Sequence, residues 1–196
     1  IKKGFSIKDV NAVLVTHQHN DHCKAVDDFI KRGITVYMSN DTRKALDLKF
    51  GFYVKQIEAG QSIKFKGWYV KAFELKHDVP NIGFYVRKFD ETLIYITDSF
   101  YCKYRFKDIN YIMLEINHSK ASIDNGLRAG YIHPALYKRL RTSHFSLENA
   151  LNFLKACDLS QLKEVRILHL SDSNGDAEFF KEEVQRLTGV YVNVER

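Results

Sequence analysis

The sequence contains few of the residues that cross-link or interrupt a chain. It has three cysteines and no Cys-x-x-Cys pair, which argues against a disulfide framework and for a reducing compartment. Only two prolines are present and no low-complexity stretch occurs, so we expect a single domain over residues 1–196. No apolar run approaches the roughly 18 residues that a membrane span needs. We therefore expect a cytoplasmic protein that makes no contact with a membrane.

What is present is typical of a soluble globular chain with a sizeable core. Hydrophobic residues make up 45% of the sequence and charged residues 28%, which are ordinary values for such proteins. The formal net charge of +6 favours an anionic substrate or partner. Composition alone does not distinguish a nucleic acid from a smaller anion.

The most informative stretch is the loop at residues 16–22, which follows the apolar run at residues 12–15. The run predicts a short buried strand with the polar loop at its end. The loop reads His-x-His-x-Asp-His and contains His17, His19, Asp21 and His22. Imidazole and carboxylate groups are ligands of divalent metals such as zinc, manganese and iron. Four ligand-type residues at this spacing indicate a metal site, and the alternative is a polar loop that happens to be rich in histidine.

Three further ligand-type residues stand at or just past the ends of later strand-like runs. They are His77, Asp98 and His169, after the runs at residues 68–75, 93–97 and 165–168. Site residues of sheet proteins gather at such strand ends. Each of the three, taken alone, is more often a solvated loop residue. Together, and behind the His-rich loop, they supply the additional ligands that a two-metal centre needs.

In these segments the chain resembles the metallo-β-lactamase-fold hydrolases. It is most similar to the bacterial and phage branch that includes YycJ-type nucleases, and more distantly similar to ribonuclease Z. The resemblance runs nearly end to end and is carried by residues 13–22, 77–84, 96–99, 114–118, 143–148 and 168–172. It implies an α/β fold, namely the four-layer αββα sandwich of that family. The order of predicted elements also suggests two packed sheets with helices on the outer faces.

The resemblance further implies a role for each site residue. His17, His19 and His77 would bind one metal ion, Asp21, His22 and His169 a second, and Asp98 would bridge them. Asp21 and His144 would be catalytic, and His144 matches a family histidine that is not a ligand and that donates a proton in the ribonuclease-like members. The implied cofactor is a pair of divalent ions, zinc or alternatively manganese or iron.

The chain departs from the family at its start. Family members begin with two or three strands, then a strand that ends in an Asp behind the metal loop. This chain opens at Ile1 without an initiator Met, so we expect an N-terminally incomplete copy that lacks those strands. Residues that orient metal ligands typically change metal affinity or activity by about 10–100-fold. The activity of this chain is therefore in question, although its ligand set is complete.

The proposed ligands leave the site electropositive, because only Asp21 and Asp98 return negative charge to two divalent ions. Zinc lowers the pKa of bound water to about 7 and so supplies a hydroxide nucleophile at neutral pH. Two metals about 3.5–4 Å apart also clamp the attacking and leaving oxygens of a phosphoryl transfer. His144 would then protonate the leaving group. The alternative for His144 is a helix-entry residue bonded to a backbone carbonyl.

Two stretches mix basic with aromatic side chains, as surfaces that contact phosphates and stack bases do. One contains Lys138, Arg139 and Arg141 just before His144, and the other is residues 101–107. Either stretch alone is equally a solvated surface, but both lie beside predicted metal residues. We therefore expect a nucleic acid or another phosphodiester as substrate. His118 is placed with the substrate-binding residues, with a structural role as the alternative.

Hydrophobic periodicity predicts the remaining elements. Strands are expected near residues 54–57, 63–65, 68–75, 82–87, 92–96, 111–116, 165–168 and 190–194. Helices are expected near residues 25–32, 42–50, 134–141, 146–157 and 177–187. Ser146 is expected to cap the N-terminus of its helix. Cys23, although next to His22, is expected to be a small buried residue rather than a ligand.

Three functions compete at this point. The first is a metal-dependent phosphodiesterase or nuclease that acts through a dinuclear metal-bound hydroxide. The second is a thioester, lactone or β-lactam hydrolase, since the same metal pair attacks a carbonyl. The third is a protein that binds metal or nucleic acid without catalysis. The basic stretches and His144 favour the first function, and the incomplete N-terminus adds weight to the third. The fold by itself does not choose among them, and the sequence does not indicate an oligomeric state.

Overall fold

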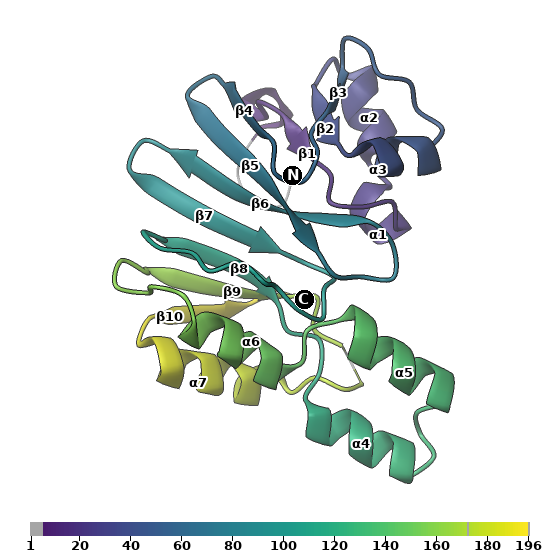
Figure 1. Cartoon of the computed structure of the whole chain (residues 1–196), viewed down its shortest axis with the longest axis vertical. Helices are drawn as coiled ribbons and strands as arrows, with labels where there is room; N and C mark the ends of the chain where they lie inside the picture. The colour runs from purple at the N-terminus through teal and green to yellow at the C-terminus, as the bar shows by residue number, and fades with distance from the viewer. Residues whose placement is uncertain (1–5, 172, 196) are drawn as a thin grey trace.

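The structure is a computed structural model that describes residues 6–171 and 173–195 (Figure 1). Within these residues the strands form a three-stranded and a seven-stranded sheet. The small sheet is parallel and consists of β1 (Val13–Leu14), β2 (Val36–Met38) and β3 (Val54–Gln56). The large sheet contains β4 (Ser62–Phe65), β5 (Trp68–Leu75), β6 (Asn81–Lys88), β7 (Glu91–Ile96), β8 (Tyr111–Glu115), β9 (Glu164–Leu168) and β10 (Tyr191–Val194).

The large sheet runs in the order β10-β9-β8-β7-β6-β5-β4, and its strand pairing changes from parallel to antiparallel at β7. Strands β4 to β7 are antiparallel, whereas β7 to β10 are parallel. The register pairs Ile96 with Leu114 and Glu115 with Leu168. Because neighbouring parallel strands end at the same edge, the residues that follow β7, β8 and β9 meet there.

The helices lie outside the two sheets. They are α1 (Asn20–Cys23), α2 (Val26–Lys31), α3 (Asn40–Ala45), α4 (Lys120–Arg128), α5 (Pro134–Ser143), α6 (Leu147–Lys155) and α7 (Ala177–Thr188), and a 3₁₀ helix spans Ile7–Asp9. Figure 1 shows α2 and α3 beside the small sheet, α6 and α7 beside β8 to β10, and the α4–α5 hairpin projecting from the body. No helix of residues 6–171 and 173–195 is long and apolar enough to cross a bilayer.

In the described part of the chain, three of the apolar cores lie between the four layers. The first lies between α6, α7 and the large sheet and includes Ile94, Ile96, Ile112, Leu114, Phe153 and Phe180. The second lies between the two sheets and includes Leu14, Tyr37, Ile57, Val70, Ile82 and Phe84. The third lies between the small sheet and its helices and includes Val26, Val36, Met38 and Leu46. Side chains alternate between faces along each strand, so one sheet contributes to two cores. The expected αββα arrangement of an α/β fold is confirmed.

Most predicted elements occur within a few residues of their expected bounds, but the helix expected at residues 42–50 instead spans Asn40–Ala45. Helix α3 begins earlier, because the Ser39 hydroxyl accepts a hydrogen bond from the Thr42 backbone N–H. It ends early as well, since Asp47 has a left-handed backbone with φ 51°. Strand β2 and helix α4 were not predicted. Helix α4 has a polar sequence with an internal glycine, Gly126, and its signal is the capping box formed by Ser119 and Ser122.

Candidate metal centre

The predicted site residues meet at one edge of the sheets. His17 and His19 lie on the loop after β1, Asp98 follows β7 and His169 follows β9. The carboxyl ends of the parallel strands β7, β8 and β9 bring the last two together with Glu115, the final residue of β8. Residues 77 and 98, far apart from the His-rich loop in sequence, are thus placed against it by the topology of the fold.

Two of these residues have a backbone conformation that L-amino acids rarely adopt. Asp98 has φ 50° and His169 has φ 54°, in the left-handed region where Asp and His are among the better tolerated non-glycine residues. An asparagine amide holds each carbonyl in place. The Asn81 amide donates to the carbonyl of Asp98 at 2.6 Å, and the Asn117 amide donates to the carbonyl of His169 at 2.9 Å. The strained turns are therefore supported from neighbouring elements.

The first group of candidate ligands consists of three imidazoles and one carboxylate oxygen. His17 Nε2 lies 3.1 Å from His19 Nδ1, which lies 3.3 Å from His77 Nε2. The Oδ2 atom of Asp98 lies 3.7 Å from His17 Nε2 and 3.5 Å from His77 Nε2. All four candidate ligand atoms lie within 4.8 Å of one another.

The second group faces the other oxygen of Asp98. Asp98 Oδ1 lies 3.3 Å from His22 Nε2 and 3.4 Å from His169 Nδ1. The Oδ2 atom of Asp21 lies 3.3 Å from His22 Nε2 and 3.4 Å from His169 Nε2. Asp98 therefore directs one oxygen toward each group, which is the arrangement required of a bridging carboxylate.

The chemistry of these groups fits divalent cations. His77 Nδ1 is 2.8 Å from the carbonyl oxygen of Ser143; this contact requires a proton on Nδ1 and leaves the Nε2 lone pair facing the other imidazoles. His22 Nε2 is buried and has no hydrogen-bond partner among the residues that the structure describes, although two carboxylates lie 3.3 Å away. Converging lone pairs and an unsatisfied ring nitrogen are what a bound cation would satisfy. The His and Asp groups are therefore placed to bind metal ions.

Burial and neighbouring charges keep three of the candidate ligands, His17, His77 and Asp98, in forms that can bind a cation. Burial, aided by repulsion from His22, lowers the pKa of His17 to about 3, so its ring is neutral at physiological pH. Burial also lowers the pKa of His77. For Asp98, burial acts to raise the pKa, but the nearby His22 and the charge of His169 outweigh it, and the pKa lies below its usual range. Neutral imidazole and ionised carboxylate are the states required for metal binding.

Sequence reasoning missed Glu115, which organises the second group. The Glu115 side chain is fully buried, and its Oε2 atom accepts from the backbone N–H groups of Ser99 at 2.9 Å and Phe145 at 3.4 Å. Its Oε1 atom lies 2.5 Å from His144 Nδ1 and 3.1 Å from His169 Nδ1. Glu115 ends an apolar strand, as His77, Asp98 and His169 follow theirs, and that signal could have identified it.

Glu115 alters the protonation of both histidines that it contacts. The hydrogen bond to Glu115 raises the pKa of His169 to about 9. Burial acts to lower the pKa of His144, yet the bond to Glu115 and its charge dominate, and the pKa is raised. His144 is only 8% exposed. Its ring lies 5.3 Å from that of His77 and 5.5 Å from that of His169.

The comparison with known proteins agrees with this geometry. Residues 2–169 match the family model described as the beta-lactamase superfamily domain. The chain belongs to this superfamily. No protein with a curated description matches the sequence.

Solved structures place the chain in the metallo-β-lactamase fold at low sequence identity. YhfI from Bacillus subtilis, a protein of that fold, has a TM-score of 0.69 and 16% identity, over 95% of this chain and 75% of YhfI. Igni18, a metallo hydrolase from the archaeon Ignicoccus hospitalis, has a TM-score of 0.65 and 16% identity, over 98% and 82% of the two chains. The short form of human tRNase Z has a TM-score of 0.56 and 17% identity, over 87% and 76%.

The predicted substrate-binding residues of this superfamily member are only partly brought to the site. Arg139 on α5 lies beside it, because its Nε atom is 3.4 Å from Asp78 Oδ2 and Asp78 Oδ1 is 3.0 Å from His77 Nε2. Arg141 instead bonds the hydroxyl of Tyr137 at 3.1 Å. Lys138 is exposed on the same helix. Asp78, which links Arg139 to the imidazoles, was not singled out from the sequence.

His118 is not where a substrate-binding residue would lie. It is only 1% exposed, and its carbonyl accepts the backbone N–H of Leu147 at 2.8 Å at the start of α6. Its assignment to substrate binding is therefore corrected, because a ring in the interior cannot touch a substrate. The structural alternative agrees with the packing. Cys23 is buried at 8% exposure, as predicted, and its thiol donates to the carbonyl of Gln18 at 3.2 Å.

Proposed function

We propose that the chain is a dinuclear metal-dependent phosphodiesterase of the YycJ-like branch and that its natural substrate is a nucleic acid. The observation that carries the proposal is the position of Asp98, whose two oxygens face two separate ligand groups. Two cations at one carboxylate suit a reaction in which an attacking and a leaving oxygen are stabilised together. Phosphodiester hydrolysis is such a reaction.

The residues that would hold the cations follow from the two groups. His17, His19 and His77 would hold one and Asp21, His22 and His169 the other, with Asp98 shared, and imidazole with carboxylate favours zinc, manganese or iron. When bound, such ions lower the pKa of a water molecule toward neutrality and offset the charge of a phosphodiester. The resident metal is proposed to be zinc.

His144 is suited to donate a proton to the departing oxygen. Its pKa is raised through Glu115, so the protonated ring is available near neutral pH, and the bond from Nδ1 fixes the ring orientation. A positioned acid of this kind contributes about 10²–10⁴-fold to the rate. Asp21 has 60% of its side chain exposed and a lowered pKa, because His22 outweighs the effect of partial burial. As an ionised group open to solvent, it would orient the attacking water and accept its proton.

Nucleic acid is favoured over other phosphodiesters by charge and by similarity. The chain carries a formal net charge of +6, and Arg139 lies at the edge of the candidate metal centre. Lys138 and Arg141 on the same helix would contact phosphates farther along a polymer. The structural neighbours include tRNase Z, which supports the same class of substrate.

The proposal is tested with metal-loaded and chelator-treated protein on a panel of substrates. The panel contains bis-p-nitrophenyl phosphate, single- and double-stranded DNA, RNA, a thioester and a β-lactam. We expect metal-dependent cleavage of the phosphodiesters, and His144→Ala should slow turnover by about 10²–10⁴-fold while metal content persists. Rapid cleavage of the thioester or lactam with intact phosphodiesters would show a carbonyl hydrolase. Full metal content without any turnover would show a binding protein.

The phosphate contacts are tested separately. Replacing Lys138, Arg139 and Arg141 together with Ala should weaken nucleic-acid binding and flatten its salt dependence. Each lost phosphate contact lowers the slope of log K against log salt by about 0.7 to 0.9. The matched control replaces Lys155, Lys181 and Arg186, which carry the same charge on α6 and α7. Equal effects of the two triple variants would remove α5 from the proposed substrate path.

A further inference from the structure

Part of the large sheet is not covered by helices. Helices α6 and α7 cover the face formed by β7 to β10, and Figure 1 shows β4, β5 and β6 extending beyond them. Two hollows, of about 470 and 400 Å³, open on this uncovered part and share Tyr69 and Tyr85 in their walls. They adjoin each other at these two tyrosines, and we call the pair the sheet groove.

The strand register places aromatic and basic side chains next to each other in the sheet groove. Tyr69 on β5 pairs with Lys64 on β4 and with Arg87 on β6. In the next row, Lys71 pairs with Tyr85. Facing positions on neighbouring strands put their side chains on the same face about 5 Å apart. The groove thus presents rings with a cation beside each.

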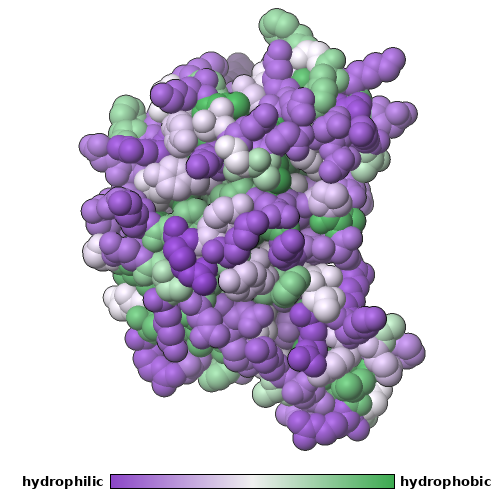
Figure 2. Space-filling model, in the orientation of Figure 1, coloured by the Kyte–Doolittle hydropathy of each residue, from purple (hydrophilic) through white to green (hydrophobic). Residues whose placement is uncertain are grey.

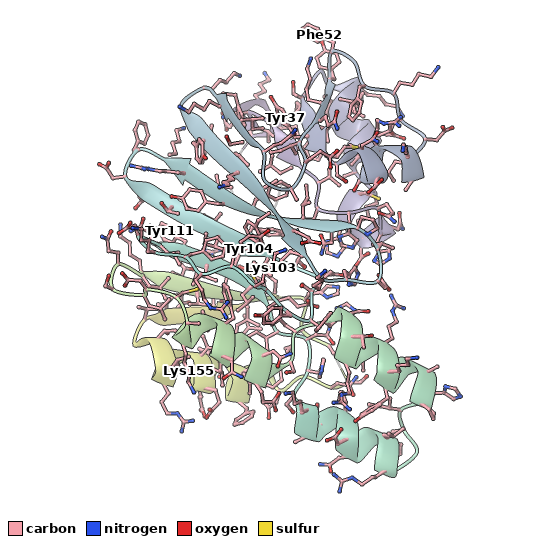
Figure 3. All side chains as sticks on the ribbon, viewed as in Figure 1. Tyr37, Phe52, Lys103, Tyr104, Tyr111 and Lys155 are labelled. Atoms are coloured by element: carbon pink, nitrogen blue, oxygen red, sulfur yellow. The ribbon has the colours of Figure 1, made fainter. Side chains whose placement is uncertain are left out.

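A loop from the metal centre completes the wall. Tyr104 and Phe106 pack against Phe73, with ring centroids 5.4 and 5.1 Å away, and Arg105 lines the groove between them. These residues belong to the basic and aromatic stretch at residues 101–107, which the sequence argument assigned to substrate contact. Figure 3 shows Tyr104 on the loop that crosses the large sheet, and Figure 2 shows pale and green side chains mixed with purple ones over this part of the molecule.

The cations of the groove are free for an anionic ligand. In the part of the chain that the structure describes, Lys64, Lys71, Arg87 and Arg105 have no ion pair, and no Asp or Glu lines either hollow. Arg87 and Arg105 bond only backbone carbonyls. Some surface cations elsewhere are paired, as Lys163 is with Glu91 at 2.9 Å. Four cations without acidic partners create a local positive potential.

We infer that the sheet groove binds single-stranded nucleic acid, as a surface separate from the metal centre. Aromatic faces beside unpaired cations match what a single strand offers, because its bases are free to stack while its phosphates meet the cations. A duplex hides its bases within the stack, and an acidic peptide would use the charges but not the rings. This inference does not require the metal centre to cleave nucleic acid.

The groove is close enough for one strand to reach both places. Only six residues separate Asp98 from Arg105, so the two lie within about 25 Å even if that segment is fully extended. A strand held in the groove would present its continuation to the metal centre. The sheet groove would then supply affinity, and the metal centre the chemistry.

The test measures binding by metal-free protein, so that cleavage does not interfere. Fluorescence anisotropy of a labelled 12-nucleotide single strand is recorded in EDTA at several salt concentrations, alongside the same sequence as a duplex. Tyr69→Leu should weaken single-strand binding about 5- to 100-fold, as the loss of one stacked base does, and Tyr69→Phe should preserve it. Lys71→Ala with Arg105→Ala should lower the salt slope by about 1.4, because each single-strand phosphate contact contributes about 0.7.

Matched controls use the same substitutions away from the groove. Tyr191→Leu changes a tyrosine that is 63% exposed on β10, and Lys181→Ala with Arg186→Ala removes two cations from α7. Both controls should bind as the unaltered protein does. The inference is overturned if the groove variants also bind normally, if the duplex binds more tightly than the single strand, or if a poly-glutamate peptide of equal charge binds as tightly.

The outcome is separable from that of the proposed function. Turnover of bis-p-nitrophenyl phosphate by the metal-loaded protein should be unchanged by Lys71→Ala alone, since that substrate is too small to span both places. Loss of single-strand binding with intact turnover locates the binding in the groove. Intact turnover with no single-strand binding in the unaltered protein rejects the groove but not the phosphodiesterase. Single-strand binding by a metal-loaded protein that shows no turnover rejects the phosphodiesterase but not the groove.

Discussion

Replacing Glu115 with Gln changes one charge at the centre of the site while preserving the shape of the side chain. The amide oxygen would accept from the backbone N–H groups of Ser99 and Phe145, as the Oε2 atom of Glu115 does. The amide NH₂ would then face the Nδ1 atoms of His144 and His169, which now face Oε1. Since an NH₂ group only donates, both rings would have to accept at Nδ1 and carry their proton on Nε2.

The size of the effect follows from His169. Its pKa of about 9, against an ordinary 6.5, has the bond to Glu115 as its largest cause. The difference corresponds to about 3 kcal/mol in favour of the protonated ring at about 1.4 kcal/mol per unit, and solvent screening of this partly exposed ring reduces it to about 1–2 kcal/mol. In the variant the pKa of His169 should fall toward 6.5. A proton on its Nε2 atom, which faces Asp21 at 3.4 Å, would block a cation in the second group.

We therefore expect the variant to lose affinity for one cation only. Zinc titration by calorimetry should show that the affinity of the site formed by Asp21, His22 and His169 falls about 10–100-fold, as for other residues that orient metal ligands. The site formed by His17, His19 and His77 should be unchanged. NMR titration of the imidazole groups in the metal-free protein should show that the titration midpoint of His169 is lower in the variant. An unchanged midpoint, or equal weakening of both zinc sites, would refute the reasoning.

The matched control is Glu148→Gln. Glu148 is a partly buried carboxylate that accepts the backbone N–H of Lys120 at 3.1 Å, outside the candidate metal centre. The same loss of charge there should leave the titration of His169 and both zinc affinities unaltered. A similar response in the two variants would indicate a general electrostatic effect instead of a specific contact with the histidines.

Two further predictions concern Asp98 and His118. Asp98 faces both ligand groups and Asp21 only one, so Asp98→Asn should lower the metal content after dialysis from two ions to below one, whereas Asp21→Asn should leave about one. Elemental analysis measures both contents. Equal contents in the two variants would rule out a shared carboxylate. His118 has its pKa lowered by burial to about 4, from 6.5. Protonation therefore favours the unfolded chain, and the stability of the metal-free protein that is present above pH 6.5 should be lost as the pH falls toward 4. Between pH 7 and 4.5 this group accounts for about 2–3 kcal/mol of unfolding free energy, and His118→Gln should show a correspondingly smaller loss in urea denaturation; identical pH profiles for the two proteins would contradict the burial argument.

The sequence alone was sufficient to predict that the candidate ligands lie at the ends of strands. Strand-like runs that end in His or Asp could be recognised because the period of two and the polar residue after it are both local signals. Trp68–Leu75 was predicted with its observed bounds, and His77 follows it after one residue. The ligand roles themselves stay predictions, although the structure brings all seven candidates together.

What the sequence could not supply depends on pairing between distant segments. Glu115 is significant because β8 lies between β7 and β9, which brings its carboxylate to His144 and His169. Exposure is equally non-local, as His118 shows: a histidine after a strand is read as accessible until α6 is seen to begin against its carbonyl. The sheet groove likewise depends on the register of β4, β5 and β6.

The geometry of the site carries a cost that explains why its ligands need so much support. Ring nitrogens of His17, His19 and His77 meet at 3.1 and 3.3 Å, and burial, with a pKa of about 3, keeps the His17 ring uncharged. Asp98 and His169 add strained left-handed backbone at two strand ends. Such arrangements persist only where the surrounding structure over-determines them, and here Asn81 and Asn117 supply that constraint. A cation would satisfy the converging lone pairs at once, and a ligand that binds the folded chain alone stabilises it by mass action. The strain is therefore best understood as preorganisation for metal binding, held by the fold before any ion arrives.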